Sequence, residues 1–324
     1  MKTYLIIQTA FIGDVILATA LIESIIEKEP TAKIDFLVRK GNDGLLVGHP
    51  HIRRVLVWDK KNNKYANLKH LAKLIRERNY DVLLNLQRFS SSGYLSWKSK
   101  AKQIVGFKKN PLSFSFHHKV NHEIGNGKHE VERNHALLLA IGDYKQAKPK
   151  LYPTSEQIQK IEEAGLPEDY IVMAPSSVWA TKQLPKSKWV ELLNQHLDQT
   201  VFFIGAKSDI EYLCEIGRAS NHKNWVCSAG STNLLESAYL ISKASMTYVN
   251  DSAPLHLASA MNASVTAFFC STIPGFGFGP LSDASKTVEV AEKLDCRPCG
   301  LHGKASCPKG HFNCGEKIDV TIVK

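Results

Sequence analysis

Short apolar runs alternate with longer stretches of helical pattern over the first 140 residues. The apolar runs indicate continuously buried strands, and they cover residues 5–8, 34–38, 55–58, 82–86 and 103–107. Between them, residues 15–29 and 68–78 repeat apolar positions at helical spacing. Strands of this kind, separated by helices, are typical of a parallel sheet covered on both faces. The stretch 112–128 has weak periodicity, and we expect it to be an irregular loop.

A second series of the same kind follows a break at residues 145–156. The break contains Lys-Pro-Lys and Tyr-Pro-Thr-Ser, which are linker and helix-start signals. Beyond it, strands are predicted at 170–174, 201–205, 225–227, 247–250 and 265–269, and helices at 187–197 and 234–242. After residue 269 the alternation stops. The pattern predicts an α/β protein with two doubly wound, Rossmann-like domains, 1–150 and 151–290, followed by a tail, 291–324.

One strand in each predicted domain leads directly into a tight turn and a helix start. In the first domain the turn is Thr-Ala-Phe-Ile-Gly-Asp, residues 9–14, and in the second it is Asn-Asp-Ser-Ala-Pro-Leu-His, residues 250–256. Doubly wound domains bind ligands outside the carboxyl ends of their strands. Because the chain has two such turns, we expect two nucleotide-fold domains that face one cleft.

The two turns resemble the signatures of glycosyltransferase family 9, the ADP-heptose:lipopolysaccharide heptosyltransferases. The family's Gly-Asp pair after the first strand is matched by Gly13 and Asp14. Its D-[ST]-x-x-x-H-[LI]-A-x-A signature is matched by residues 251–260. The chain departs from the family at Ala253-Pro254, where many members have Gly-Pro or Gly-Leu. This departure bears on the sugar-nucleotide preference and leaves the fold unaffected.

A third segment carries the same resemblance. The family has a small-residue turn, then K-x-[WL]-P, then a tryptophan on the next helix. Here these are Ala-Pro-Ser-Ser at 174–177, Lys-Gln-Leu-Pro at 182–185, and Trp189. The resemblance spans nearly the whole chain. It implies the GT-B fold and an inverting, metal-independent transfer of a heptose or related sugar. The donor would be an ADP-sugar held by the C-terminal domain, and the acceptor a lipopolysaccharide core held by the N-terminal domain.

Asp14 is the predicted general base. It lies in or near the first turn of the first helix, where a carboxylate can simply cap the helix at a gain of about 1 kcal/mol. The helix dipole favours its ionised form, and an ionised carboxylate in a cleft can accept a proton from a sugar hydroxyl. The resemblance implies this catalytic role, while the capping role stays open.

The second turn is the predicted donor site. Ser252, Ala253 and the N–H groups that follow open a helix, and a helix N-terminus attracts a leaving diphosphate. Asp251 is anionic, so we expect it to accept hydrogen bonds from sugar hydroxyls of the donor. His256 follows one turn after Ser252. It either contacts or supports the phosphates, or it is a structural histidine.

Two other loops complete the predicted donor site. The resemblance implies that Lys182 neutralises the donor diphosphate as a compact charge, and the alternative is an ordinary solvated lysine. Ser176 and Ser177 would add hydroxyl contacts to the phosphates or the reacting centre. Asp209 follows another predicted strand. It matches the position of an acid near the ribose hydroxyls in the family, or it is merely an acid at a helix N-terminus.

A basic region in the first half is the predicted acceptor surface. Gln87 and Arg88 follow the fourth predicted strand, and Arg133 and a lysine cluster at 98–109 would join them. The inner core of lipopolysaccharide carries carboxylates and phosphates. The planar guanidinium of arginine binds such groups through two parallel hydrogen bonds.

Charge and hydropathy bear on partners and location. A net charge of +10 and a pI of about 9.1 fit nucleic acid, an anionic membrane surface or phosphorylated substrates. We find no secretory signal and no run of 18 uncharged apolar residues. We therefore expect a cytoplasmic protein that contacts the inner face of the inner membrane peripherally. No aromatic–basic nucleic-acid module is recognisable, and no nucleic-acid partner is expected.

Seven cysteines, an odd number, fit reduced thiols or a metal site better than a disulfide framework. Four of them have the spacing C-x2-C-x7-C-x6-C in a segment rich in glycine and proline: Cys296, Cys299, Cys307 and Cys314. This set suits one structural zinc ion, or an iron ion, and four unrelated reduced thiols are the alternative. No catalytic metal is expected, since no D-x-D-like pair stands at a strand end.

Two other functions stay open at this point. A GT-B sugar-nucleotide enzyme of different chemistry, such as an epimerase, would share the fold but would release donor products without an acceptor. A basic nucleic-acid-binding protein with a zinc knuckle would bind strands with a steep dependence on salt.

Overall fold

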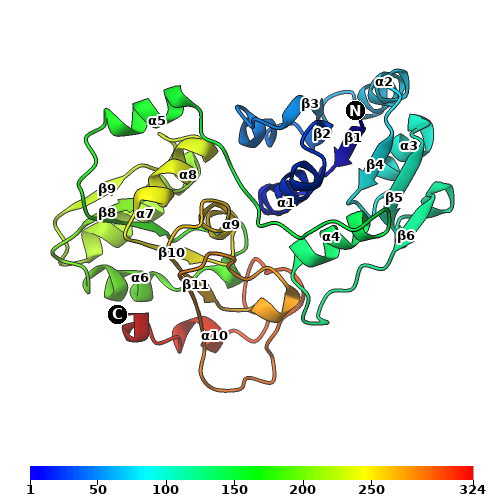
Figure 1. The fold of residues 1–324 in the computed structure, drawn as a ribbon. Helices are drawn as coiled ribbons and strands as arrows, with labels where there is room; N and C mark the ends of the chain where they lie inside the picture. The colour runs from blue at the N-terminus through cyan, green and yellow to red at the C-terminus, as the bar shows by residue number, and fades with distance from the viewer. Residues whose placement is uncertain (324) are drawn as a thin grey trace. The chain divides into compact units, whose positions relative to one another are not determined.

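Residues 1–323 are described by a computed structural model, which divides into two compact units (Figure 1). The first unit is Met1–Tyr152, and the second begins at Pro153. The division falls within residues 145–156, where the linker signals predict a break. Each unit contains its own parallel sheet and its own cluster of buried apolar side chains.

The first unit is a six-stranded parallel sheet in the order β3-β2-β1-β4-β5-β6. Its strands are β1 (Thr3–Ile7), β2 (Lys33–Arg39), β3 (Ile52–Trp58), β4 (Val82–Asn85), β5 (Gln103–Phe107) and β6 (His118–Val120). Its helices are α1 (Ile12–Lys28), α2 (Lys64–Glu77), α3 (Ser90–Ser99) and α4 (Glu130–Leu139). Helix α1 packs on α4 and α2 packs on α3, so the two pairs cover the sheet (Figure 1).

The second unit repeats this architecture with the order β12-β11-β10-β7-β8-β9. Its strands are β7 (Tyr170–Ala174), β8 (Thr200–Phe203), β9 (Trp225–Cys227), β10 (Met246–Asn250), β11 (Val265–Phe269) and β12 (Ser285–Glu289). Its helices are α5 (Ser155–Glu162), α6 (Lys186–Leu193), α7 (Ile210–Ala219), α8 (Leu234–Lys243), α9 (Ala253–Ala260) and α10 (Asn313–Glu316). Helices α5, α8 and α9 pack in series, and α6 packs on α7.

Both units are doubly wound, which confirms the predicted fold class. In the first unit the strand order reverses between β1 and β4, and in the second between β7 and β10. Ligands of such sheets bind outside the carboxyl ends of the strands at this reversal. The predicted base, Asp14, follows β1 and the predicted donor residue Asp251 follows β10, so each lies at the reversal point of its own sheet.

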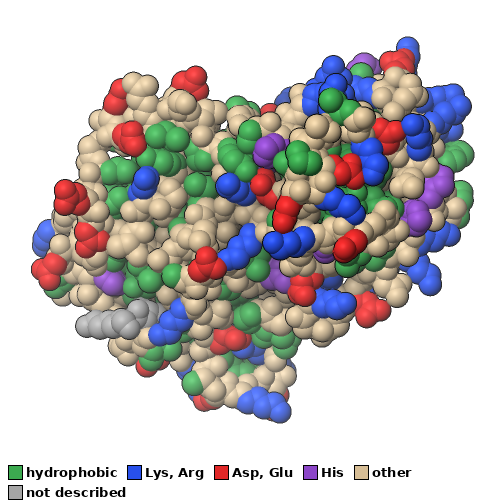
Figure 2. Space-filling view, viewed as in Figure 1, with side chains coloured by type: hydrophobic (Ala, Val, Ile, Leu, Met, Phe, Trp, Pro, Cys, Tyr) green, Lys and Arg blue, Asp and Glu red, His purple; other side chains and the backbone are tan. Residues whose placement is uncertain are grey.

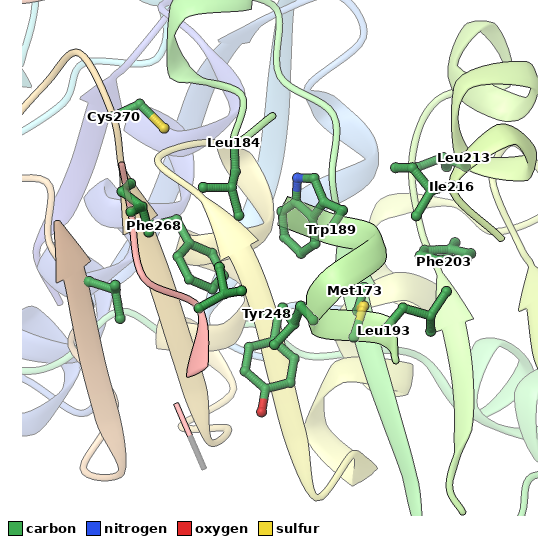
Figure 3. Close-up of a cluster of buried hydrophobic side chains, with 14 of the residues drawn as sticks. Met173, Leu184, Trp189, Leu193, Phe203, Leu213, Ile216, Tyr248, Phe268 and Cys270 are labelled. Carbon is green, nitrogen blue, oxygen red and sulfur yellow. The ribbon is translucent and has the colours of Figure 1, made fainter. Parts of the chain in front are cut away.

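Trp189 of α6 is central to the core of the second unit (Figure 3). Its ring is fully buried and lies edge-on to Phe268 of β11, with 5.5 Å between the ring centroids. Tyr248 of β10 stacks against Phe268 in the same cluster, with 6.4 Å between the ring centroids. Loss of such a ring typically costs about 3–5 kcal/mol. This packing fixes the start of α6 and therefore the loop that precedes it.

Three parts of the fold differ from the sequence prediction. The irregular stretch 112–128 contains the short strand β6, and residues beyond 269 contain β12. Both are edge strands with exposed positions, so neither forms a continuous apolar run. The expected separate tail, 291–324, is part of the second unit, because Cys314, Ile318 and Val320 are buried in its core.

Candidate active site

Asp14 lies in the first turn of α1, shortly after β1 ends. Its carboxylate accepts a hydrogen bond from the backbone N–H of Phe11 at 3.1 Å. The side chain is half-buried. Asp14 therefore occupies the capping position that the sequence analysis left open, and its electrostatic state decides whether it can do more.

Burial raises the pKa of Asp14 to about 6, and the negative charge of Glu130 adds to the rise. Hydrogen bonds from the helix start and the positive charge of Arg39 act in the opposite direction but are outweighed. The helix dipole thus does not decide the pKa of Asp14. The free energy of hydration that the carboxylate loses on burial is larger than the stabilisation that it gains from the helix start. A carboxyl with this pKa is largely ionised at pH 7 and basic enough to accept a proton, which suits a general base.

Glu130, whose charge acts on Asp14, belongs to a buried network. Its carboxylate oxygens lie 3.1 Å from Nε2 of His122, and Nε of Arg133 donates to Oε2 at 2.7 Å. Burial alone would raise the pKa of Glu130, but these two partners lower it overall. Arg133 is only 3% exposed and also donates to the carbonyl of Lys128. The guanidinium is therefore held inside the first unit by these contacts, and its part in acceptor binding stays a prediction.

Gln87 and Arg88 follow β4, beside the end of β1. Gln87 is buried, and its side-chain amide donates to the side-chain oxygen of Gln8, so the two strand ends are joined. Asn110 donates to the Gln87 carbonyl at 2.9 Å. Arg88 is exposed. Of this predicted pair, Arg88 is the side chain that a ligand in solution can reach.

Lys60, which the sequence analysis did not single out, lies at the same edge of the sheet. Its Nζ donates to the carbonyl of Thr9 at 2.7 Å. Burial lowers the pKa of Lys60 to about 8, and the positive charges of Arg39 and Lys64 add to the fall. Cations gathered in this way attract an anionic ligand. In the sequence Lys60 is one lysine among many, so only the fold distinguishes it from a solvated side chain.

The predicted donor residues Lys182 and Asp251 form an ion pair in the second unit. Nζ of Lys182 lies 2.6 Å from Oδ2 of Asp251, and the two side chains are 15% and 7% exposed. The hydroxyl of Thr272, just after β11, donates to the same carboxylate oxygen at 2.6 Å. The sequence predicts separate ligands for the two charges, whereas the fold makes them partners. Thr272 is not predicted from the sequence, because no local pattern marks it.

Asn250, the last residue of β10, ties the Lys182 loop to the sheet. Its Oδ1 accepts the backbone N–H of Leu184 at 2.9 Å, and its Nδ2 donates to the carbonyl of Pro175 at 2.7 Å. Both ends of loop 175–184 are thereby held at one strand end. Lys182 therefore stands on an anchored loop and not on a freely moving one.

Ser252, Ala253 and His256 lie at the start of α9. Ser252 is the N-cap residue, and no cap hydrogen bond to its side chain forms. Pro254 lacks an N–H, so the helix start offers fewer donors than an ordinary one. His256 is buried, with its ring edge-on to Phe278 at 6.5 Å between centroids. The helix start is thus arranged beside Asp251, and His256 is packed within the second unit.

Ser176 and Asp209 contact each other at the carboxyl ends of β7 and β8. The Ser176 hydroxyl donates to Asp209 Oδ2 at 2.8 Å, and so does the backbone N–H of Ala206. Asp209 therefore caps the start of the next helical segment, as its plainer interpretation predicts. Ser177 lies alongside, and its hydroxyl accepts the N–H of Trp179 at 3.4 Å.

The four cysteines of the tail are free thiols in one region of the second unit. Burial raises the pKa of Cys299, and the neighbouring Cys296 and Cys307 raise it further. Burial raises the pKa of Cys314 to about 11, and the neighbouring Cys299, Cys307 and Cys296 add to the rise. Burial also acts to raise the pKa of Cys307, but four backbone N–H groups of residues 309–312 lower it overall. Among residues 1–323, no three His, Cys, Asp or Glu side chains are arranged to hold a metal ion.

Basic side chains gather on one part of the first unit. Figure 2 shows Lys and Arg side chains along the edge formed by α2, α3 and β6. On α3, Trp97 is 48% exposed, and Nζ of Lys98 lies 3.9 Å from its ring centroid. Phe114, in the short 3-10 helix Ser113–Ser115 that contacts α3, is exposed as well. Within residues 1–323, the helices are all too short or too polar to cross a membrane.

Known proteins share both sequence and fold with this chain. The family model described as glycosyltransferase family 9 (heptosyltransferase) matches residues 68–306. A lipopolysaccharide heptosyltransferase 3 of Escherichia coli is 27% identical over 285 residues, which cover 81% of this chain and 82% of that protein. A lipopolysaccharide core heptosyltransferase OpsX of Haemophilus influenzae is 27% identical over 305 residues, covering 90% and 85%. The structure of an E. coli ADP-heptose LPS heptosyltransferase II has a TM-score of 0.77 at 20% identity, covering 92% and 96%.

Proposed function

The chain belongs to glycosyltransferase family 9, as its motifs suggested, and we propose that it transfers a heptose from an ADP-sugar to a lipopolysaccharide core acceptor. The names of its relatives support the sugar, the nucleotide and the acceptor. A related sugar in place of heptose would use the same residues. The match to this family also favours transfer over the epimerase and nucleic-acid-binding alternatives.

The transfer is proposed to be a single displacement with inversion. A hydroxyl of the acceptor gives its proton to the Asp14 carboxylate, and its oxygen attacks the anomeric carbon of the donor. The bond from that carbon to the diphosphate breaks, and ADP leaves with the electron pair. The observation that carries this role is the half-buried Asp14 carboxyl with a pKa of about 6 at the end of β1.

The donor is proposed to bind at the carboxyl ends of β7, β8 and β10. Lys182 would neutralise the diphosphate, and the helix start at Ser252 and Ala253 would add N–H groups. Asp251 would accept hydrogen bonds from the sugar hydroxyls. The remaining predicted contacts are the hydroxyls of Ser176 and Ser177, Asp209 at the ribose and His256 near the phosphates. No catalytic metal has a part in this scheme.

The acceptor is proposed to bind at the carboxyl ends of β1 and β4. Arg88 is exposed there, and Lys60 with its neighbours Arg39 and Lys64 would attract the carboxylates and phosphates of a lipopolysaccharide core. Gln87 would orient the site from its buried position. Arg133 would act from the interior, by holding Glu130.

Two further parts of the proposal concern the membrane and the tail. The exposed ring of Trp97 beside Lys98 suits an anionic membrane surface, which attracts basic segments by about 1 kcal/mol per cation. Cosedimentation with anionic vesicles but not with neutral ones would support peripheral contact with the inner membrane. We also propose that the four tail thiols, which are not arranged around a metal ion in residues 1–323 as described, move together when they bind zinc or iron; the cysteine spacing supports this.

Transfer from ADP-heptose to a heptose-deficient lipopolysaccharide core tests the proposed function directly. Wild-type protein should release ADP only when acceptor is present, and the Asp14→Asn variant should bind donor but lose most transfer. The variant Asp198→Asn changes an exposed carboxylate elsewhere and should behave as wild type. Release of ADP without acceptor, or transfer from UDP- or GDP-sugars in preference, would contradict the proposal.

A further inference from the structure

The tail segment 297–304 packs against the loop that carries Lys182 and against residues 269–272, where Thr272 bonds to Asp251. We propose that this segment fixes the geometry of the pair for sugar-nucleotide binding, with Arg297 as the positioning residue. The inference rests on the proposed function, in which Lys182 and Asp251 contact the donor. It gives the cysteine-rich tail a part in donor recognition in addition to any structural metal.

Arg297 fastens the tail to the exit of β11. Its Nε donates to the carbonyl of Cys270 at 2.6 Å, and its Nη2 donates to the carbonyls of Phe269 and Thr272 at 3.0 and 2.7 Å. The carboxylate of Glu289 on β12 balances the charge. One guanidinium therefore satisfies three carbonyls of a four-residue stretch, which a flexible point charge such as lysine cannot do with equal geometry.

Thr272 connects this anchor to the donor pair. Its carbonyl is bound by Arg297, while its hydroxyl donates to Oδ2 of Asp251 at 2.6 Å. The same oxygen lies 2.6 Å from Nζ of Lys182. Because Thr272 is 1% exposed, its hydroxyl has little freedom to move apart from its backbone. A shift of the backbone that Arg297 holds therefore shifts the partner of the Asp251 carboxylate.

A second set of contacts joins the tail to the loop that carries Lys182. Thr181 donates its N–H to the carbonyl of Lys304 at 3.1 Å, and its hydroxyl oxygen accepts the N–H of Lys304 at 2.8 Å. The Thr181 carbonyl accepts the N–H of Ser271 at 3.2 Å. Thr181, which directly precedes Lys182, is thereby bonded to the tail at Lys304 and to Ser271 after β11.

Gly303 lies against the stem of Lys182 itself. A Cβ at this position would come within 2.4 Å of Cβ of Trp179 and within 2.9 Å of Cγ of Lys182. The tail backbone can approach the lysine only because residue 303 has no side chain. The tail backbone at Gly303 therefore fixes the position of the Lys182 side chain. Arg297 fixes the position of the Asp251 carboxylate through Thr272.

Calorimetry and steady-state kinetics on matched tail variants test the inference. Arg297→Met should raise the Kd and KM for ADP-heptose about tenfold, within the roughly hundredfold that a misplacement of about 1 Å can cost. Arg297→Lys, which restores the charge without the fork, should recover only part of the loss. Lys317→Met removes an exposed tail ion pair with Glu292 and should leave both constants unchanged. Equal ADP-heptose affinity in Arg297→Met and wild type would overturn the inference.

Two further variants separate positioning from folding. Gly303→Ala displaces the Lys182 side chain and leaves Arg297 unchanged. If Arg297→Met does not melt cooperatively, the Kd of Gly303→Ala for ADP-heptose tests the inference in its place. Combining Arg297→Met with Thr272→Val should lose no more affinity than the larger single loss, since Thr272 carries the effect of Arg297. If the two losses of affinity add in the double variant, the effect of Arg297 does not pass through Thr272. Wild-type protein that binds no ADP-sugar would overturn the proposed function and the inference together, whereas normal wild-type binding with insensitive tail variants overturns the inference alone.

Discussion

Replacing Asp14 with asparagine is expected to stabilise the first unit while it removes most of the transfer activity. The pKa of Asp14 rises from an ordinary 3.8 to about 6 in the folded protein. A rise of about two units corresponds to roughly 3 kcal/mol by which folding disfavours the ionised carboxylate. Asparagine keeps an oxygen that can accept the Phe11 N–H, and it has no charge to desolvate. The loss of a general base lowers the rate of transfer about 10²–10⁴-fold.

The expected stabilisation has a defined pH dependence. Because the pKa of Asp14 is higher in the folded than in the unfolded chain, its penalty is absent below about pH 4. The penalty grows between about pH 4 and pH 6 and is constant above that range. The stability difference between Asp14→Asn and wild type is therefore largest at pH 7 and disappears toward pH 4. Wild-type kcat/KM should fall about tenfold per pH unit below pH 6, as the base becomes protonated.

Urea unfolding at pH 7 and pH 4.5 measures the stability difference, and transfer from ADP-heptose measures the activity. Asp198→Asn, which neutralises an exposed carboxylate, should change neither quantity. If Asp14 only caps α1, asparagine would lower stability by up to about 1 kcal/mol at every pH above its titration, and transfer would stay near the wild-type rate. That combination would refute the reasoning from desolvation and the assignment of the base.

The other predictions concern the donor site, metal dependence and the tail. Asp251→Ala should weaken binding of ADP-heptose more than binding of ADP, and equal losses in calorimetry would contradict its assignment to the sugar. Lys182→Ala should weaken both ligands, since a charge-assisted phosphate contact is lost, and should lower the urea midpoint because Asp251 stays buried without its cation. EDTA should leave transfer unchanged in folded protein; loss with EDTA and recovery with Mg²⁺ would oppose this. Cys299→Ser should lower the melting temperature and the zinc or iron content; elemental analysis that finds almost no metal in fresh wild-type protein, with unchanged melting in the variant, would leave four ordinary thiols.

The sequence predicts the strands of both sheets best where both faces are covered. β1 and β10 lie inside their sheets, so all their residues after the first are buried and form mostly apolar runs, and the small-residue turns after them give the positions of Asp14 and Asp251. β12 lies at a sheet edge with exposed residues at its start, and its sequence contains no such run. Burial on two faces, and not strand formation as such, is what the hydrophobic pattern records.

The partners of the candidate site residues could not be predicted in the same way. Lys182 and Asp251 meet because β7 and β10 are neighbours, although β8 and β9 separate them in the chain. Arginine is usually an exposed residue, yet Arg133 is buried and paired with Glu130. Local spacing identifies which residues reach a strand end. Strand order decides which of them become partners.

The placement of residues 314–320 in the core of the second unit has a consequence for biosynthesis. The first unit has a complete sheet and core within Met1–Tyr152, so it can fold while the ribosome is still making the rest. The core around Trp189 lacks Cys314, Ile318 and Val320 until those residues emerge. The proposed donor half therefore acquires its native core later than the acceptor half, and a nascent chain exposes that unfinished apolar surface to chaperones and proteases in the meantime.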